Sequence, residues 1–367
     1  MNLGPRLAYS PRRFAARAAI GLALAGLPAC GPRESVFDLA APRTLQIATY
    51  EGSGQLVHPD VIRWPAGGSD LWMAVTPYPN THEKWENPSI YRSRDGLHWT
   101  EPVERENPVV SRPPCDHNCD PDLVATGKAL DLFYLESERS KLCTDGRNFQ
   151  NLRVCTSTDG RQWSKPTTVI HWDLDHDPFY LSPCIVPVGG GWRLFLVWPK
   201  GRTIEWLSST DLRTFGEPRG VMQTGLEGVR PWHLDVFPVD GGWVALLCAR
   251  GPDARDNLDV DLWIGASPDL ERWSFRPAPF LAGGDPALGI EIVYRSTGLL
   301  RGNRLAIWYS GRTPEGHWLV GATSCDAAVV RELLAAAAAS PASPPSPPPL
   351  AHFPEESPSE QTSVFSP

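Results

Sequence analysis

A seven-residue pattern that occurs five times constrains the fold of this chain more than any other feature. Its clearest copy is Ser-Thr-Asp-Gly-Arg-Gln-Trp at residues 157–163. The aspartates of the five copies are separated by 64, 52, 58 and 57 residues and are Asp95, Asp159, Asp211, Asp269 and Asp326. This recurrence indicates one supersecondary unit used five times. Each copy follows a run of strand-forming residues, so the unit is a β blade.

The residue types of the pattern explain its role. Asp followed by Gly reverses the chain tightly, because an Asx turn and a positive φ are both available there. The aromatic residue four positions after the Asp opens the next strand, where we expect it to pack against a neighbouring blade. These positions hold Trp99, Trp163, Phe215 and Trp273, with Val330 in the fifth copy. The pattern predicts an all-β, five-bladed β-propeller over residues 45–328, in which the repeated turns are structural.

The N-terminal residues do not belong to the repeats. Residues 1–30 have the layout of a signal peptide, with a basic segment containing Arg12 and Arg13 and a ten-residue apolar stretch at 18–27, too short to span a bilayer. Leu-Pro-Ala-Cys then ends at Cys30, which is similar to a bacterial lipobox. We therefore expect an exported lipoprotein in the periplasm or at the cell surface. Cleavage after Ala29 without lipidation is the alternative.

The segments flanking the propeller have different expected roles. Residues 31–44 are a spacer, and residues 45–49 form an isolated strand that could complete the fifth blade and close the ring. Residues 329–339 predict a short helix from their Ala, Leu and Glu content. Residues 340–367 are rich in Pro and Ser and predict a disordered tail.

Export makes the cysteines candidates for disulfides. The expected pairs are Cys115 with Cys119 and Cys143 with Cys155. The loop 115–119 also contains His117, but a single short loop without a distant second pair of ligands is a weak zinc signal, so no metal site is predicted there. Three other cysteines lie in apolar strands and are expected to be packed thiols: Cys184, Cys248 and Cys325.

Composition limits the partners of the chain. A formal charge of −8, without a Lys/Arg run after the leader, argues against nucleic acid and against any membrane contact except a lipid anchor. Fifteen tryptophans exceed what blade packing alone requires, and the C–H faces of sugars stack on such rings. We expect a monomer whose partner is an oligo- or polysaccharide.

Polar residues open the first strand of every predicted blade. In a propeller these strands line the central channel, so their opening residues meet at one mouth. Several converging carboxylates repel one another, and this cost is typical of a functional site; a solvated channel is the alternative. The candidates are His58, Asp60, Asp120, Asp122, Ser182, His233, Asp235, Glu291, Tyr294 and Arg295.

The five turns and blade openings such as Pro121-Asp122-Leu123 resemble the five-bladed furanosidase-like glycoside hydrolases, the superfamily of arabinanases, β-xylosidases and fructosidases. The resemblance covers residues 57–326 and is strongest to uncharacterised members with His-Pro-Asp and Glu-Asn-Pro segments, here at 58–60 and 86–88. Sialidases differ, because their Asp-box places five positions between Asp and the aromatic residue, whereas the four ring-bearing copies here have four. The resemblance implies a propeller that binds a glycan at the channel mouth.

The chain departs from the arabinanase pattern at three positions. Where that pattern has its base, its pKa modulator and its acid, this chain has His58, Ser182 and the Trp232/His233 pair. Only Asp122 matches its supporting position. The arabinanase mechanism therefore does not transfer unchanged.

A glycosidase still needs two carboxyl groups about 5–10 Å apart across the scissile bond. Our hypothesis assigns the base to Asp60 or Asp122 and the acid to Glu86 or Glu291, with Asp235 as a further candidate. Substrate would be bound by His58, Asp120, Ser182, His233, Tyr294 and Arg295, with stacking on Trp64, Trp85 and Trp232. No cofactor is predicted, and a divalent cation such as Ca²⁺ in the channel is the alternative.

These observations predict an exported, glycoside hydrolase-like carbohydrate-active protein that binds and hydrolyses a glycan at the mouth. The alternatives are a propeller that binds glycan without cutting it and an envelope scaffold, because fold alone does not fix function.

Lipidation at Cys30 can be tested by detergent phase separation. We expect the mature protein in the detergent phase and the Cys30→Ala variant in the aqueous phase, because the variant lacks the anchoring thiol. A wild-type protein found entirely in the aqueous phase would contradict lipidation.

Overall fold

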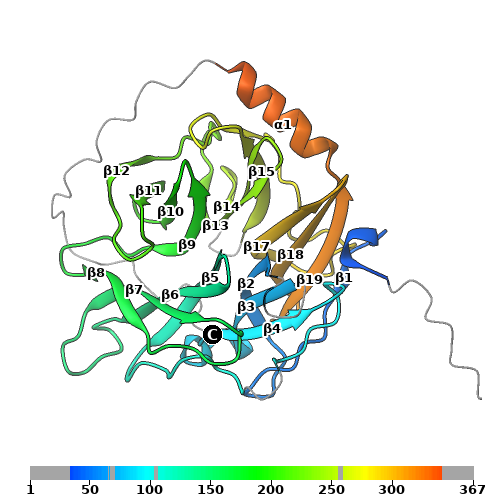
Figure 1. The fold of residues 1–367 in the computed structure, drawn as a ribbon. Helices are drawn as coiled ribbons and strands as arrows, with labels where there is room; N and C mark the ends of the chain where they lie inside the picture. The colour runs from blue at the N-terminus through cyan, green and yellow to red at the C-terminus, as the bar shows by residue number, and fades with distance from the viewer. Residues whose placement is uncertain (1–33, 65, 67–70, 103–105, 255–258, 341–367) are drawn as a thin grey trace, which may run out of the picture. The chain divides into compact units, whose positions relative to one another are not determined.

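The computed structural model describes residues 34–64, 66, 71–102, 106–254 and 259–340. The predicted signal segment, Cys30 and the tail after Ser340 lie outside these residues. The described chain forms five antiparallel sheets arranged as the blades of a β-propeller (Figure 1), which confirms the fold predicted from the repeats.

Each blade begins with the strand nearest the axis. Blade one is β2 (Leu56–Arg63), β3 (Leu71–Pro77) and β4 (Ser89–Ser93); blade two is β5 (His117–Thr126), β6 (Ala129–Glu138), β7 (Phe149–Ser157) and β8 (Thr167–Asp173). Blade three is β9 (Leu181–Val188), β10 (Gly191–Trp198), β11 (Thr203–Ser209) and β12 (Gly216–Val221). Blade four is β13 (Arg230–Val239), β14 (Gly242–Arg250), β15 (Asp261–Ser267) and β16 (Ser274–Phe275). Blade five is β17 (Ile292–Arg301), β18 (Arg304–Arg312), β19 (Trp318–Asp326) and β1 (Arg43–Thr44).

The last blade is completed by the first strand of the chain. Arg43 and Thr44 in β1 pair with β19, and Leu45 N–H donates to Val320 O at 2.9 Å. This exchange joins the two ends of the propeller and covers an edge that would otherwise be exposed. The closing strand was expected at 45–49 and starts two residues earlier.

The segment before β1 is not a free spacer from Glu34 onward. The 3₁₀ helix η1 (Val36–Asp38) packs on the propeller, where Val36 and Phe37 are buried beside Trp308 of blade five. At the other end, α1 (Ala328–Ala339) lies against β15 and β16 of blade four. Of the described helices, none combines the length and apolarity that crossing a bilayer requires.

The repeated turns have the geometry that their residue types predict. Ser157 Oγ accepts Gly160 N–H at 2.8 Å, and Asp159 Oδ1 accepts the N–H groups of Arg161 and Gln162. Gly160 has a φ of +69°, and a Cβ there would come within 2.1 Å of the Trp72 ring in blade one. The motif aromatics pack between blades, as where Trp99 meets Trp308 edge to face at 6.1 Å. Their structural role is therefore confirmed.

The disulfide pairing expected from the sequence is wrong. Cys115 bonds to Cys143, whereas Cys119 and Cys155 are buried free thiols. Cys119 lies in β5 with its side chain in the core beside Phe133, and Cys155 lies in β7, so strand geometry directs both into the blade. The loops that precede β5 and follow β6 bring the bonded pair together.

A ring of hydrogen bonds joins the five inner strands β2, β5, β9, β13 and β17. In each strand one side chain accepts a backbone N–H of the inner strand in the next blade. The five acceptors, which we call the closing ring, are Asp60 (to Leu123, 2.5 Å), Asp122 (to Ile185, 3.0 Å), Cys184 (to Val236, 3.0 Å), Asp235 (to Gly298) and Thr297 (to Val61, 3.3 Å). Every acceptor is buried, so each bond satisfies a backbone donor that water does not reach.

Three predicted catalytic carboxylates, Asp60, Asp122 and Asp235, therefore lie in the closing ring, where they connect blades. Burial, and for Asp60 and Asp122 a neighbouring carboxylate, raises the pKa of all three, and that of Asp60 reaches about 7. Arg295 lies among them and opposes the rise. The repulsion among these carboxylates therefore arises from side chains that join the blades.

The raised pKa of Asp60 makes stability depend on pH. The protonated carboxyl favours folding, so its contribution is complete below the ordinary pKa of 3.8 and is lost as the pH rises through about 7. Asp60→Asn keeps an acceptor for Leu123 N–H without titrating. Between pH 4 and 7 we expect the unfolding free energy of the wild type to fall relative to this variant by up to about 1.4 kcal/mol per pH unit.

Denaturant unfolding across this pH range measures the difference. The matched control is Asp240→Asn, an exposed substitution in the turn between β13 and β14 that leaves the pH dependence unchanged. A difference between wild type and Asp60→Asn that is constant with pH would contradict a raised pKa of Asp60 in the folded protein.

Candidate active site

A second ring of side chains lies two residues before the closing ring in every inner strand. We call it the mouth ring, and its members are His58, Asp120, Ser182, His233 and Arg295. A register shift between each inner strand and its neighbour includes the mouth-ring residue in four blades and lies directly before His233 in blade four. His58, Asp120 and Ser182 have φ between 50° and 60°, a conformation that non-glycine residues rarely adopt. The bulges turn these side chains toward one another, and no more than 5% of any is exposed.

Asp120 connects the other members of the mouth ring. Its Oδ1 lies 3.5 Å from His58 Nε2, 3.5 Å from His233 Nδ1 and 3.4 Å from Arg295. Its Oδ2 accepts the Ser182 N–H at 3.0 Å. Although burial alone would raise the pKa of Asp120, these three basic groups outweigh it and hold the pKa well below its usual range. Asp120 is therefore an ionised carboxylate in the centre of the propeller.

His58 is oriented by a carboxylate on its far side. Its Nδ1 lies 3.1 Å from Glu86 Oε2 and 3.2 Å from the hydroxyl of Thr76, which also donates to Glu86. Its Nε2 is buried and has no hydrogen-bond partner in the described structure. Nε2 thus faces only the Asp120 carboxylate, at 3.5 Å, while Nδ1 is held by a carboxylate, an arrangement typical of metal-binding histidines.

His233 is the second imidazole of the mouth ring. Its Nδ1 lies 2.6 Å from Ser182 Oγ, and its Nε2 is buried without a partner in the described structure. The rings of His58 and Tyr294 pack against it at 4.9 and 4.4 Å. Burial lowers the pKa of His233 far below the usual value, and the attraction of Asp120 does not compensate. The lowered pKa favours the uncharged form of this imidazole.

The contact between Ser182 and His233 is not that of a nucleophilic triad. In a triad the acid and the serine occupy different nitrogens of the histidine. Here Asp120 and Ser182 both face Nδ1 of His233. Ser182 consequently fixes the ring orientation of His233.

His58, Asp120 and His233 can hold a cation. Each offers one ligand atom, and these atoms lie within 4.8 Å of one another. Two imidazoles and one carboxylate form a ligand set that catalytic divalent metals use, with further positions left for water or substrate. The two unpartnered Nε2 atoms are the observation that fits a metal, because buried imidazole nitrogens are otherwise hydrogen-bonded.

His117 also belongs to the site, although in the sequence it is only part of a weak zinc signal. Ligand atoms of His117, Glu86 and Cys119 lie within 4.8 Å of one another. Its Nδ1 lies 2.5 Å from Asp116 Oδ1, and Arg139 links Asp116 to Glu83 in the 3₁₀ helix η4 (Glu83–Trp85). Burial would lower the pKa of His117, but the bond to Asp116 outweighs it and raises the pKa.

Three other residues predicted from the sequence, Glu291, Trp64 and Trp232, lie outside the mouth ring. Glu291 pairs with Arg312, and its side chain is partly exposed, so it lies outside the mouth ring. Trp64 is buried in blade one against Trp72. The indole of Trp232 donates to the Tyr294 hydroxyl at 3.1 Å. The structure therefore brings neither Glu291 nor Trp64 to the candidate site.

Trp85 is one of two large hydrophobic residues classed as exposed in the described chain, with 38% of its surface accessible. It directly precedes Glu86, whose carboxylate contacts His58, and its carbonyl accepts the Tyr50 hydroxyl at 2.6 Å. This indole beside the mouth ring is available to a ligand, as the sequence-based hypothesis requires.

Several known proteins are similar to this chain in sequence or in fold. No family model matches the chain. A curated protein of Flavonifractor plautii, an A type blood N-acetyl-alpha-D-galactosamine deacetylase, is 29% identical over 228 residues, covering 50% of this chain and 29% of that protein. The chain thus spans less than a third of the length of this relative.

Solved structures show the same architecture. An N-acetylgalactosamine deacetylase from F. plautii, in complex with blood group B trisaccharide, superposes with a TM-score of 0.70 at 22% identity, over 80% of this chain and 97% of that one. The GH43 protein BlXynB of Bacillus licheniformis gives 0.55 at 15% identity, over 77% and 54%. An exo-1,5-alpha-L-arabinanase from a bovine ruminal metagenomic library gives 0.52 at 11%, over 74% and 92%. The resemblance to furanosidase-like propellers is confirmed at the level of the fold.

The pairing of Asp116 with His117 can be tested by NMR titration of the imidazole. In Asp116→Asn we expect the pKa of His117 to fall, because the hydrogen bond that raises it no longer comes from a charged acceptor. Asp95→Asn, which removes the carboxylate beside exposed His98, is the control and leaves the titration of His117 unchanged. An unaltered His117 in Asp116→Asn would show that another group sets its protonation.

Proposed function

We propose that this chain is a carbohydrate-active hydrolase that removes the acetyl group of an N-acetylated sugar, assisted by a divalent cation at His58, Asp120 and His233. The observation that carries the proposal is the buried cluster of His58, Asp120 and His233, whose ligand atoms lie within 4.8 Å of one another while the Nε2 atoms of both histidines make no hydrogen bond in the described structure. The relative and the solved structure named as N-acetylgalactosamine deacetylases support the choice of reaction.

The reaction is the addition of water to the amide carbonyl, followed by cleavage of the C–N bond to give acetate and a free amine. A cation bound there would polarise the carbonyl and lower the pKa of water. Glu86 is the candidate base: its Oε2 is held by Thr76 and His58, while its Oε1 has no hydrogen bond within the described residues. His117, with its raised pKa, is the candidate donor to the departing amine.

Glycoside hydrolysis is less well supported by the positions of the acids. Asp60, Asp122 and Asp235 are occupied with backbone donors of neighbouring blades, and Glu291 is paired with Arg312. Glu86 and Asp120 remain, but Asp120 is fully buried among His58, His233 and Arg295. This environment favours a ligand to a cation over an acid that faces a scissile glycosidic bond.

We also propose that the protein acts outside the cytoplasm, as the leader-like N-terminus predicts. The Cys115–Cys143 disulfide supports this, because such bonds persist mainly in oxidising compartments. A lipid anchor at Cys30 remains part of the proposal.

The proposed reaction predicts acetate release from N-acetylhexosamine glycosides that depends on the mouth ring. We expect chelation to abolish release and a divalent cation to restore it, and His58→Ala and His233→Ala to lose at least about a hundredfold in kcat/KM. Enzymatic quantification of acetate measures the rate. Glu86→Gln should lose activity while still binding the cation, because Glu86 orients His58 without being a ligand.

His171→Ala is the matched control, because His171 lies in the outer strand β8 and bonds Asn151. It should retain activity and cation binding. Release of reducing sugar without acetate would replace the proposal by glycoside hydrolysis. Equal activity in wild type and His233→Ala would also refute it.

A further inference from the structure

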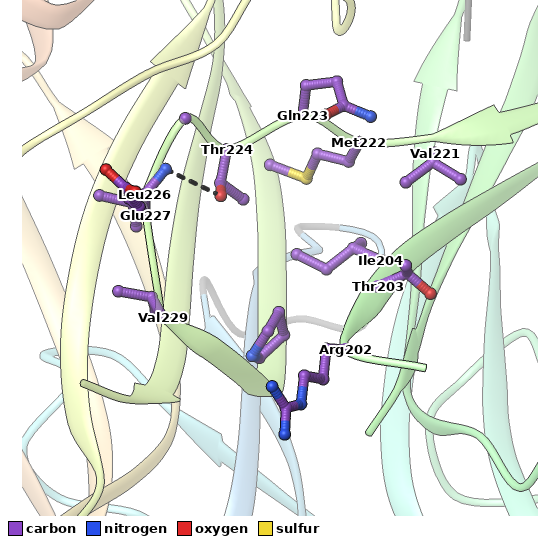
Figure 2. A pocket seen from close by; sticks show the side chains of 12 residues that line it. Arg202, Thr203, Ile204, Val221, Met222, Gln223, Thr224, Leu226, Glu227 and Val229 are labelled. Atoms are coloured by element: carbon purple, nitrogen blue, oxygen red, sulfur yellow. Dashed lines mark hydrogen bonds between the residues drawn. The ribbon is translucent and has the colours of Figure 1, made fainter. Parts of the chain in front are cut away.

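A second cavity opens on the same face of the propeller as the mouth ring, between blades three and four. It has a volume of about 440 Å³, within the range of small-ligand sites. Figure 2 shows Arg202, Thr203 and Ile204 on one side and Leu226, Glu227 and Val229 on the other. A role of this cavity in substrate binding rests on the proposed function, because the same substrate would extend into it from the mouth ring.

Strand direction places this cavity on the mouth face. β9 starts at the mouth with Leu181 and Ser182, so the antiparallel β10 returns there at Trp198, β11 leaves from Thr203 and β12 returns at Val221. The segment 222–229 then crosses to β13, whose Pro231 lines the cavity. The cavity walls are therefore loops and strand ends on the side where substrate enters.

The cavity is close to the reacting position. Pro231 is two residues before His233 in β13, which corresponds to about 7 Å along a strand. Trp232 stands between them, with Arg250 stacked on its ring at 4.2 Å. A sugar bound in the cavity would thus be a near neighbour of a sugar at the mouth ring.

The lining has the chemistry of a site for a neutral sugar. Leu226 and Val229 are partly exposed apolar side chains that the C–H face of a sugar ring can contact, and the buried Ile204 and Met222 lie behind them. Arg202 and Glu227 are exposed, and neither side chain has an ion pair in the described structure. The guanidinium can donate to sugar hydroxyls, and the carboxylate can accept from them.

The charge of the cavity lining favours a neutral sugar over an acidic one. Glu227 balances Arg202, so the cavity has no net positive charge with which to bind a uronic or sialic acid. Gln223 and Thr224 add uncharged polar groups, and the hydroxyl of Thr224 accepts the Leu226 N–H at 3.3 Å. We infer that this cavity is a subsite for the neutral sugar that is linked to the N-acetylated residue, so that the enzyme prefers an oligosaccharide over a monosaccharide.

The test compares two substrates: a neutral trisaccharide ending in N-acetylgalactosamine and a simple N-acetylgalactosamine glycoside. In Arg202→Ala and Glu227→Gln we expect kcat/KM for the trisaccharide to fall about tenfold through KM, the loss expected for one charged hydrogen bond. The value for the glycoside should not change. Lys200→Ala is the matched control, because Lys200 lies in the same turn but does not line the cavity.

The outcomes separate the subsite from the reaction. Equal losses on both substrates, or no loss on either, would overturn the subsite while leaving deacetylation in place. If the wild type releases no acetate, the proposed function fails, and calorimetric binding of the two sugars still decides the subsite. A trisaccharide that binds wild type about tenfold more tightly than Arg202→Ala would support it, whereas equal affinities would overturn it.

Discussion

Hydrogen bonds between consecutive inner strands are the interaction on which this structure depends. A propeller closes only if five separate sheets keep a common spacing around one axis. Here each inner strand supplies one acceptor, from Asp60 round to Thr297, for a backbone N–H of the next blade. Loss of one acceptor leaves a buried N–H of the next blade unpaired, which costs about 1–3 kcal/mol. It also removes a bond between two blades. The strand exchange of β1 with β19 closes the last sheet.

The same repeat also forms the candidate site, which lies two residues before the closing ring in each inner strand. A bulge in each inner strand presents a second side chain toward the centre, and this position holds a different residue type in most blades. The closing-ring side chains accept backbone donors of the next blade, whereas the mouth-ring side chains contact one another around Asp120. Arg295 belongs to the mouth ring but also stabilises the buried carboxylates below it. The residues of the candidate site and the residues that join the blades are therefore only two positions apart in each inner strand.

The sequence predicted the repeats well because their turns are local. Ser157, Asp159 and Gly160 contact one another within four residues, so spacing alone reports their geometry. The sequence also predicted that polar openings converge on the axis. It did not show which members of each opening face the next blade, because a bulge between His58 and Asp60 reverses the alternation assumed for a regular strand. Carboxylates expected to be catalytic consequently lie in the closing ring.

Other parts of the site depend on tertiary contacts that the spacing of residues in the sequence does not predict. Glu86 and His117 come from a 3₁₀ segment of blade one and the first residue of β5, and they meet only because the loops fold over the mouth. The disulfide shows the same limit, since Cys115 and Cys143 belong to loops separated by strands β5 and β6.

The positive φ values of His58 and Asp120 show how the candidate cation site depends on the closing ring. Each costs about 1–3 kcal/mol in a non-glycine residue, and each precedes a proline that further restricts it. Such strain persists only where the surroundings determine the backbone more strongly than the residue does. The closing ring provides this constraint two residues away, where Asp60 and Asp122 fix the same strands to their neighbours. The geometry of the candidate cation site is thus maintained by the bonds that close the propeller, and weakening those bonds would relax His58 and Asp120 first.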